Sequence, residues 1–231
     1  WELGYGDVHM VPDLDTLRLA TWLEKTAFVV CDVKSEKTHD FVDVAPRTLL
    51  RRQIEAAKKA GYVGYAGTEL EHYLFQTSYR QAAQQDFRNL EPAGWYLEDY
   101  HILQTTKEEG VMRAIRNGLQ GAGIPVENSK GEWGPGQEEI NVKYAEALEM
   151  ADRHVILKNG CKEIAWAQGK AITFMAKWDF GLAGSSSHIH VSLWDKAGKT
   201  PLFLDPKGEH GMSPLMRHFV AGQLAYAREI T

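Results

Sequence analysis

Hydrophobic and polar positions along the first third of the chain predict a strand, a helix and a further strand. Residues 26–33 (TAFVVCDV) form a short apolar run, which is typical of a buried strand. Residues 46–60 (PRTLLRRQIEAAKKA) have helical spacing, with Pro46 suited to the first turn and Gly61 to the end. Residues 62–75 (YVGYAGTELEHYLF) predict one long strand or two short ones.

The middle of the chain alternates loops with regular elements. Residues 76–105 are polar and irregular, so we expect an excursion there. Thr106 followed by Glu109 predicts a capping box that begins a helix running to Gln120. Residues 121–142 then indicate a strand, a glycine-rich loop and another strand.

The last third predicts two helices with two strands between them. Residues 144–168 have the pattern of a long helix. Its expected inner face consists of Leu148, Ala151, Val155 and Ile156. Strands are predicted over residues 170–178 and 188–195, the second closed by a KAGK turn, and a final helix begins at Ser213 and Pro214. Because strands and helices alternate without regular βαβ spacing, the pattern favours an α+β fold: a mostly antiparallel sheet with helices on one side.

Composition narrows the class of protein. A chain of 231 residues that is 44% hydrophobic has enough apolar side chains for a sizeable core. The net charge of −5 and the scattered basic residues indicate no nucleic-acid partner. No apolar run or signal sequence indicates a membrane, and Cys31 and Cys161 lack CxxC spacing, so we expect a cytoplasmic protein. The chain begins with Trp1 rather than Met, so we expect it to be part of a longer polypeptide.

Two of the predicted strands carry polar side chains on one face. Because side chains alternate across a strand, Glu69 and Glu71 share a face. By the same rule, His188, His190 and Ser192 share a face of the strand predicted over residues 188–195. The opposite face of that strand is expected to pack into the core through Ile189, Val191 and Leu193. Either strand alone would be an ordinary surface strand.

A third acidic segment makes a bound cation the better explanation. Glu132 and Glu139 flank a loop whose glycines allow a sharp turn, so both carboxylates can face one point. If four glutamates and His188 converge, their repulsion and desolvation require a cation. Carboxylates with a single imidazole favour Mg²⁺ or Mn²⁺ over zinc, and five ligands suit two ions better than one. Such a pair of ions is typical of phosphoryl transfer.

The three segments resemble motifs of the glutamine synthetase family, in its bacterial class. ELEHYLF is similar to an ExExxLF-type strand, GEWGPGQEEI to an HEVAPGQHEI-type segment, and FGLAGSSSHIHVSLW to an FGxNGSGxHxHxSL-type motif. They occur in the family's order, and the likeness extends over nearly all 231 residues. The resemblance implies the curved antiparallel sheet of that catalytic domain, present here as one partial domain over residues 1–231. From the resemblance we expect the family's N-terminal β-rich domain and its C-terminal part to lie outside these residues.

The resemblance also implies a ligase reaction and roles for single residues. In the family, ATP phosphorylates the γ-carboxylate of glutamate, and ammonia then attacks the acyl phosphate to form glutamine. The implied metal ligands are Glu69 and His188 for one Mg²⁺ or Mn²⁺, and Glu71, Glu132 and Glu139 for the second. The implied substrate contacts are Glu127, His190 and Ser192 for ATP, and Gly184 for glutamate. No catalytic nucleophile is expected, and a cytoplasmic ring of identical subunits, commonly two stacked hexamers, is implied.

Departures from the family pattern leave alternatives open. Ala183 stands where the family often has Asn, and Ser186 and Ser187 replace a Gly-Met-type pair. The acceptor or the donor can therefore differ from ammonia and glutamate, and a polyamine or another amine is an alternative acceptor. The family's later arginines and one metal-binding glutamate lie beyond this chain, so we expect these residues alone to be inactive. A non-catalytic binding or structural homologue is a further alternative, and a metal-dependent hydrolase ranks last.

Overall fold

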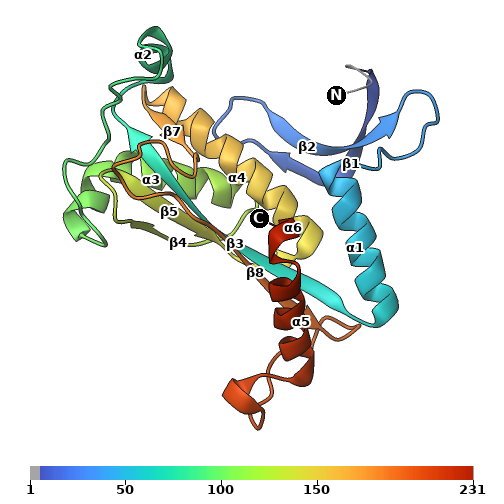
Figure 1. Ribbon diagram of the computed structural model, residues 1–231. Helices are drawn as coiled ribbons and strands as arrows, with labels where there is room; N and C mark the ends of the chain where they lie inside the picture. Colours follow the sequence, from blue (N-terminus) through green and yellow to red (C-terminus); the bar gives the residue numbers. More distant parts are fainter. Residues whose placement is uncertain (1–5, 231) are drawn as a thin grey trace.

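The computed structural model describes residues 6–230, which form an antiparallel main sheet, a separate two-stranded sheet and helices around them (Figure 1). The elements are β1 (Val8–Leu19), β2 (Ala27–Ser35), α1 (Pro46–Ala60), β3 (Val63–Phe75), α2 (Tyr79–Gln84), α3 (Ile102–Gly121), β4 (Val126–Gly131), β5 (Gln137–Val142), β6 (Ala145–Glu146), α4 (Ala147–Ala167), β7 (Ala171–Thr173), β8 (Ser187–Trp194), the 3-10 turn η1 (Glu209–Gly211), α5 (Pro214–Ala225) and α6 (Ala227–Ile230). The predicted α+β class is confirmed.

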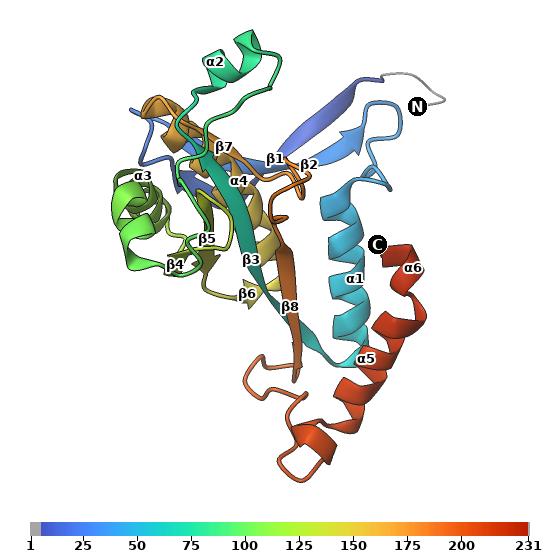
Figure 2. The same ribbon diagram turned by 60° about the vertical axis from the view of Figure 1, so that its left-hand side comes forward.

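Strand β3 organises the main sheet. Its second half pairs with β5 on one side and with β7 on the other, and β4 extends the sheet beyond β5. Strand β8 lies on the same side as β7 and pairs with the first half of β3, from Val63 to Leu70. The short β6 pairs with the first half of β3. All these pairs are antiparallel, and Figure 2 shows β8 running alongside β3. The residues predicted as one strand or two therefore form a single long one.

The two faces of β3 and β5 have different surroundings. Leu70 and Leu74 point into the main core with Ile140 of β5, where helices α3 and α4 cover the sheet. The helices contribute Val111, Met112, Ile115, Leu119, Met150, Ile156, Leu157, Cys161 and Ile164 to this core. Tyr73 and Phe75 form a smaller cluster on the opposite face. Because the helices take one face, the other face is left for the predicted glutamates.

Two helix predictions require correction. Helix α3 begins at Ile102, and the hydroxyl of Thr106 donates to the carbonyl of Ile102 at 3.0 Å, so Thr106 is inside the helix rather than at its cap. The capping box lies instead in the irregular segment, where Ser78 begins the short helix α2. In α4, Ile156 is buried as expected, but Val155 is 61% exposed because the sheet faces the Met150–Leu157–Cys161 side.

Strand β8 was expected to bury its apolar face, and this expectation is wrong. Ile189 is 67% exposed and Val191 is 38% exposed. In the described part of the chain, the core under the sheet is built from α3 and α4, and no residue of β8 belongs to it. Strand β2 is also only half-buried, and β7 covers only Ala171–Thr173 of the predicted segment.

Strands β1 and β2 form a separate sheet that is attached to α1 and α4. The guanidinium of Arg47 in α1 donates to Asp152 of α4 at 2.9 and 3.0 Å. It also donates to Asp32 of β2 and to Asp13 of β1, each at 2.7 Å. One buried arginine therefore joins four elements. Among residues 6–230, no helix combines the length and hydrophobicity that crossing a membrane requires.

Candidate active site

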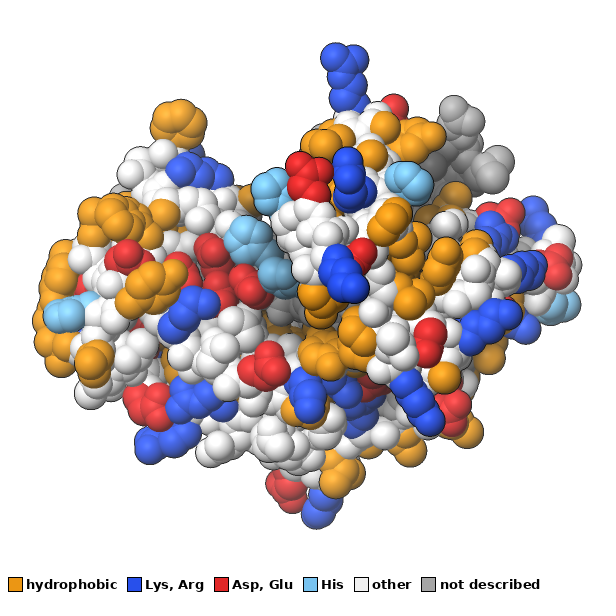
Figure 3. All heavy atoms as spheres, turned by 90° about the horizontal axis from the view of Figure 1, so that it is seen from below, with side chains coloured by type: hydrophobic (Ala, Val, Ile, Leu, Met, Phe, Trp, Pro, Cys, Tyr) orange, Lys and Arg blue, Asp and Glu red, His pale blue; other side chains and the backbone are white. Residues whose placement is uncertain are grey.

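The antiparallel register brings four of the five predicted metal ligands together. Glu71 of β3 lies directly opposite Glu139 of β5, and Glu69 lies directly opposite His188 of β8. Directly paired residues on neighbouring strands share a face, and so do residues two apart on one strand. All four side chains therefore lie on the face away from α3 and α4, where Figure 3 shows acidic side chains gathered beside histidines.

Glu132 joins this group from the loop between β4 and β5. Its backbone N–H donates to the carbonyl of Gln137 at 2.7 Å, which closes the loop. Burial, followed by the charges of Glu139 and Glu71, raises the pKa of Glu132 to about 7. The charges of Glu139 and Glu71 therefore act on Glu132. The sharp turn that was expected of this loop occurs at Gly136, whose φ of +75° is one that L side chains rarely adopt.

Two neighbouring side chains, Lys130 and His190, already contact the acidic cluster. The ammonium of Lys130 on β4 forms an ion pair with Glu139 and lies 3.7 Å from Glu132. Burial disfavours the charged ammonium, but Glu139 and Glu132 outweigh burial and raise the pKa of Lys130. Glu69 contacts His190, at 2.9 Å between Oε1 and Nε2, rather than the opposite His188. Sequence reasoning missed Lys130, which lies two residues before the predicted ligand Glu132.

The donor set suits a hard divalent cation, although the side chains are not arranged around one. Over residues 6–230, no three His, Cys, Asp or Glu side chains converge closely enough to hold an ion. Lys130 is paired with Glu139, and His190 contacts Glu69, so two of the proposed metal ligands already have protein partners. Glu132 is the observation that fits a metal: its half-buried carboxylate faces two others, with Lys130 no nearer than 3.7 Å.

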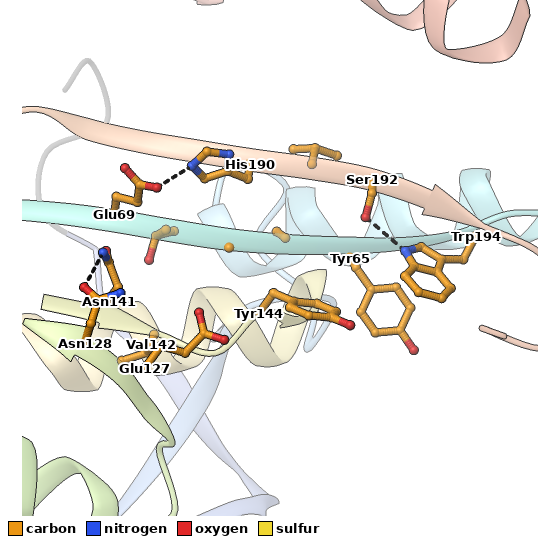
Figure 4. A pocket seen from close by; sticks show the side chains of 14 residues that line it. Tyr65, Glu69, Glu127, Asn128, Asn141, Val142, Tyr144, His190, Ser192 and Trp194 are labelled. Atoms are coloured by element: carbon orange, nitrogen blue, oxygen red, sulfur yellow. Dashed lines mark hydrogen bonds and ion pairs between the residues drawn. The ribbon is translucent and has the colours of Figure 1, made fainter. Parts of the chain in front are cut away.

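A cavity of about 390 Å³ adjoins the acidic face (Figure 4). All three predicted nucleotide contacts line it: Glu127 from β4, and His190 and Ser192 from β8. Glu69 also lines the cavity, so the acidic cluster and the cavity share a wall. His190 belongs to both, because it lines the cavity and contacts Glu69.

Aromatic side chains form the other end of this cavity. The ring of Tyr65 lies 5.1 Å from Trp194 and 5.9 Å from Tyr144, measured between centroids. The indole N–H of Trp194 donates to Ser192 Oγ at 3.0 Å. Sequence reasoning missed these three rings. The strand period offered a signal for two of them, since Tyr65 shares a face with Glu69, and Trp194 shares one with Ser192.

The segment around Gly184 lies against the other end of the acidic face. The hydroxyl of Tyr73 donates to the carbonyl of Ala183 at 2.9 Å, and the amide of Gln137 donates to the carbonyl of Gly184 at 3.0 Å. A Cβ on Gly184 would lie 2.8 Å from the carbonyl oxygen of Ala176, so this close backbone approach requires glycine. Gly184 is therefore held beside Glu71 through Gln137, and its role as a substrate contact stays a prediction.

Comparisons with known proteins agree with this geometry. The family model described as "Glutamine synthetase, catalytic domain" matches residues 43–231. The chain is 45% identical over 231 residues to the γ-glutamylethanolamide synthetase GlnA4 of Streptomyces coelicolor, covering 100% of this chain and 49% of that protein. It is 41% identical over 231 residues to a glutamate–isopropylamine ligase of a Pseudomonas species, covering 100% of this chain and 50% of the relative.

Further relatives include enzymes named glutamine synthetase. The protein of that name from Thermotoga maritima is 33% identical over 228 residues, which cover 97% of this chain and 50% of the relative. Among solved structures, "Apo GmaS without ligand" matches with a TM-score of 0.86 and 27% identity, covering 97% of this chain and 51% of that chain. The chain thus spans about half the length of the curated relatives it matches.

Proposed function

The chain belongs to the glutamine synthetase family, and from this premise we propose that the protein joins glutamate to an amine at the expense of ATP. The observation that carries the proposal is the shared wall between the acidic cluster and the cavity. Glu69 and His190 lie at that boundary, where a nucleotide's terminal phosphate can meet a second anionic substrate. Such chemistry depends on positioning and neutralised charge rather than on a nucleophilic side chain.

Each group of residues has a role in the proposal. The cavity takes the nucleotide, with Tyr65, Tyr144 and Trp194 against its base and with Glu127, His190 and Ser192 contacting the remainder. The segment that contains Gly184 takes glutamate. The protein's part in the reaction is to hold the γ-carboxylate in line with the terminal phosphate and to keep the amine beside Glu132.

Two Mg²⁺ or Mn²⁺ ions are part of the proposal. Glu69 and His188 would hold one ion, and Glu71, Glu132 and Glu139 would hold the other. When bound, the ions would neutralise the charge that accumulates between ATP and glutamate. The carboxylates on one face support this assignment, whereas Lys130 must leave Glu139 for the second ion to enter.

An amine larger than ammonia is the better candidate for the acceptor. The relatives at 45% and 41% identity are named for an ethanolamide product and an isopropylamine substrate, whereas the glutamine synthetase of Thermotoga maritima is 33% identical. Tyr100 and Trp133 also expose aromatic rings beside the acidic face, and the charge of Glu132 is the main cause that raises the pKa of Tyr100. A carboxylate beside exposed rings suits an alkylammonium group.

Because we expect these 231 residues alone to be inactive, metal-dependent release of ADP by the full-length protein tests the reaction. We expect release to require both glutamate and an amine, and to be faster with ethanolamine or isopropylamine than with ammonia. ADP release that ignores glutamate and every amine would refute the ligase proposal and favour a hydrolase. Failure of the protein to bind nucleotide or Mn²⁺ would favour a non-catalytic binding or structural protein instead.

Nucleotide binding can be measured on this chain without turnover. Energy transfer from tryptophan to a fluorescent ATP analogue reports occupancy of the cavity next to Trp194. We expect Tyr144→Ala to weaken binding about fivefold or more, because stacking on one aromatic ring contributes ~1–3 kcal/mol. Tyr226→Ala is the matched control, since Tyr226 is 65% exposed on another part of the chain. Equal affinities for the two variants would place the nucleotide elsewhere.

We further propose a cytoplasmic ring of identical subunits. The support is membership of the family. Mass photometry of the purified protein measures the number of subunits directly. A monomer at micromolar concentration would contradict the ring for this chain.

A further inference from the structure

Gln137 is a buried amide at the junction between the acidic cluster and the Gly184 segment. It is the first residue of β5 and only 1% exposed. Its side-chain N–H groups donate to Glu71 Oε2 at 2.8 Å and to the carbonyl of Gly184 at 3.0 Å. Its side-chain oxygen accepts from the backbone N–H of Gly134 at 2.9 Å. Both donors and the acceptor are therefore in use, and each has a partner on a different segment.

The Gly184 segment and Glu71 are held to each other by further bonds. The backbone N–H of Ser186 donates to Glu71 Oε2 at 2.9 Å, the same oxygen that accepts from Gln137. The backbone N–H of Glu71 donates to the carbonyl of Ser186 at 3.2 Å. Gln137 and the segment therefore hold the Glu71 carboxylate in one orientation. If the segment moves, Glu71 loses the hydrogen bond from Ser186, and Gln137 loses its hydrogen bond to Gly184.

From these contacts we propose that Gln137 is a positioning residue that couples metal binding at Glu71 to glutamate binding at the segment of residues 183–186. This inference rests on the proposed function, because it takes the metal and glutamate sites from there. A metal on Glu71 fixes the carboxylate, which fixes Gln137 and with it the carbonyl of Gly184. Glutamate bound against that segment fixes the same bonds from the other end. By thermodynamic linkage, each ligand then raises the affinity for the other by the same factor.

Gln104 provides a matched control. It is also a completely buried glutamine, and its side-chain N–H donates to the backbone carbonyl of Gln137 at 3.1 Å. It contacts neither Glu71 nor the Gly184 segment. Gln104→Met and Gln137→Met therefore both remove a buried amide beside the same turn, but only the second removes the link between the two sites.

The experiment measures binding rather than turnover. Free Mn²⁺ is followed by electron paramagnetic resonance, and the affinity for L-glutamate is measured by calorimetry with and without Mn²⁺. We expect Gln137→Met to weaken Mn²⁺ binding ~10–100-fold, the range for residues that orient a metal ligand. We also expect the factor by which Mn²⁺ raises glutamate affinity to fall, and both quantities to be unchanged in Gln104→Met.

Two outcomes would overturn the inference. If Gln137→Met binds Mn²⁺ and glutamate as the unmodified protein does, Gln137 serves packing alone and the proposed function is unaffected. If the unmodified protein binds neither ligand, the proposed function and the inference fail together. Gln137→Ala is a second variant in case the Met variant does not fold. It also removes the donors to Glu71 and Gly184, so the same loss of Mn²⁺ affinity is expected.

Discussion

Replacing Arg47 with Met tests whether the sheet of β1 and β2 is held to the catalytic domain by one buried ion network. The side chain of Arg47 is 13% exposed, and those of Asp152 and Asp32 are 6% and 10% exposed. Arg51 also contacts Asp32 and Asp13, so those carboxylates keep a partner in the variant. Asp152, by contrast, pairs with Arg47 in the described contacts. In the variant, its carboxylate therefore becomes an unpaired buried charge.

The expected loss follows from that unpaired charge. Removing one partner of a buried ion pair costs about 3–5 kcal/mol, whereas removing both partners together costs much less. We therefore expect Arg47→Met to lower the free energy of unfolding by about 3–5 kcal/mol, and Arg47→Met with Asp152→Leu to recover part of it. For a domain of this size the single variant should melt roughly 10 °C lower. Urea denaturation followed by circular dichroism measures both variants.

The pH dependence gives the same reasoning a second check. The hydrogen bond from Arg47 is the main cause that lowers the pKa of Asp13 below 3.8. A carboxyl group with a lowered folded-state pKa stabilises the protein above its ordinary pKa, and this stability is lost as the pH falls through the folded value. The difference in the free energy of unfolding between Arg47→Met and the unmodified protein should therefore become smaller below about pH 4. The role of Arg47 would be refuted if Arg47→Met lowered the free energy of unfolding by less than about 1 kcal/mol at pH 7. It would also be refuted if the difference from the unmodified protein grew in acid.

Three further predictions concern the site and the core. Gly136→Ala combines a φ of +75° with a Cβ only 2.8 Å from the backbone of Leu74 and Ala93, so we expect at least ~2 kcal/mol of destabilisation in urea titrations. Burial lowers the pKa of His72 to about 4, so ~3 kcal/mol of stability should be lost as the pH falls from 6.5 to 4, and His72→Leu should flatten this profile. Burial raises the pKa of the Cys161 thiol to about 12, so a thiol reagent should label Cys31 alone until the protein is unfolded.

Local periodicity accounts for what the sequence predicted correctly. Helix α1 has the predicted bounds because Pro46 suits its first turn, and Gly61 ends it in the left-handed conformation. The two-residue period placed Glu69 and Glu71 on one face of β3, and the paired register confirms that they lie on the same side as Glu139. These features depend on neighbours in the chain, so the chain alone determines them.

Tertiary structure decided the features that depend on distant segments. Pairing β3 with β5 and β8 joins residues about 70 and 120 positions apart, and no local pattern specifies which carboxylate faces which imidazole. The contact of Glu69 with His190, the ion pair of Lys130 with Glu139 and the link through Gln137 all follow from that register. The exposure of Ile189 has the same origin, because an apolar strand face is buried only where another element covers it. The sequence therefore identified the carboxylates and imidazoles of the site, but the pairing of the strands determined which of them contact one another.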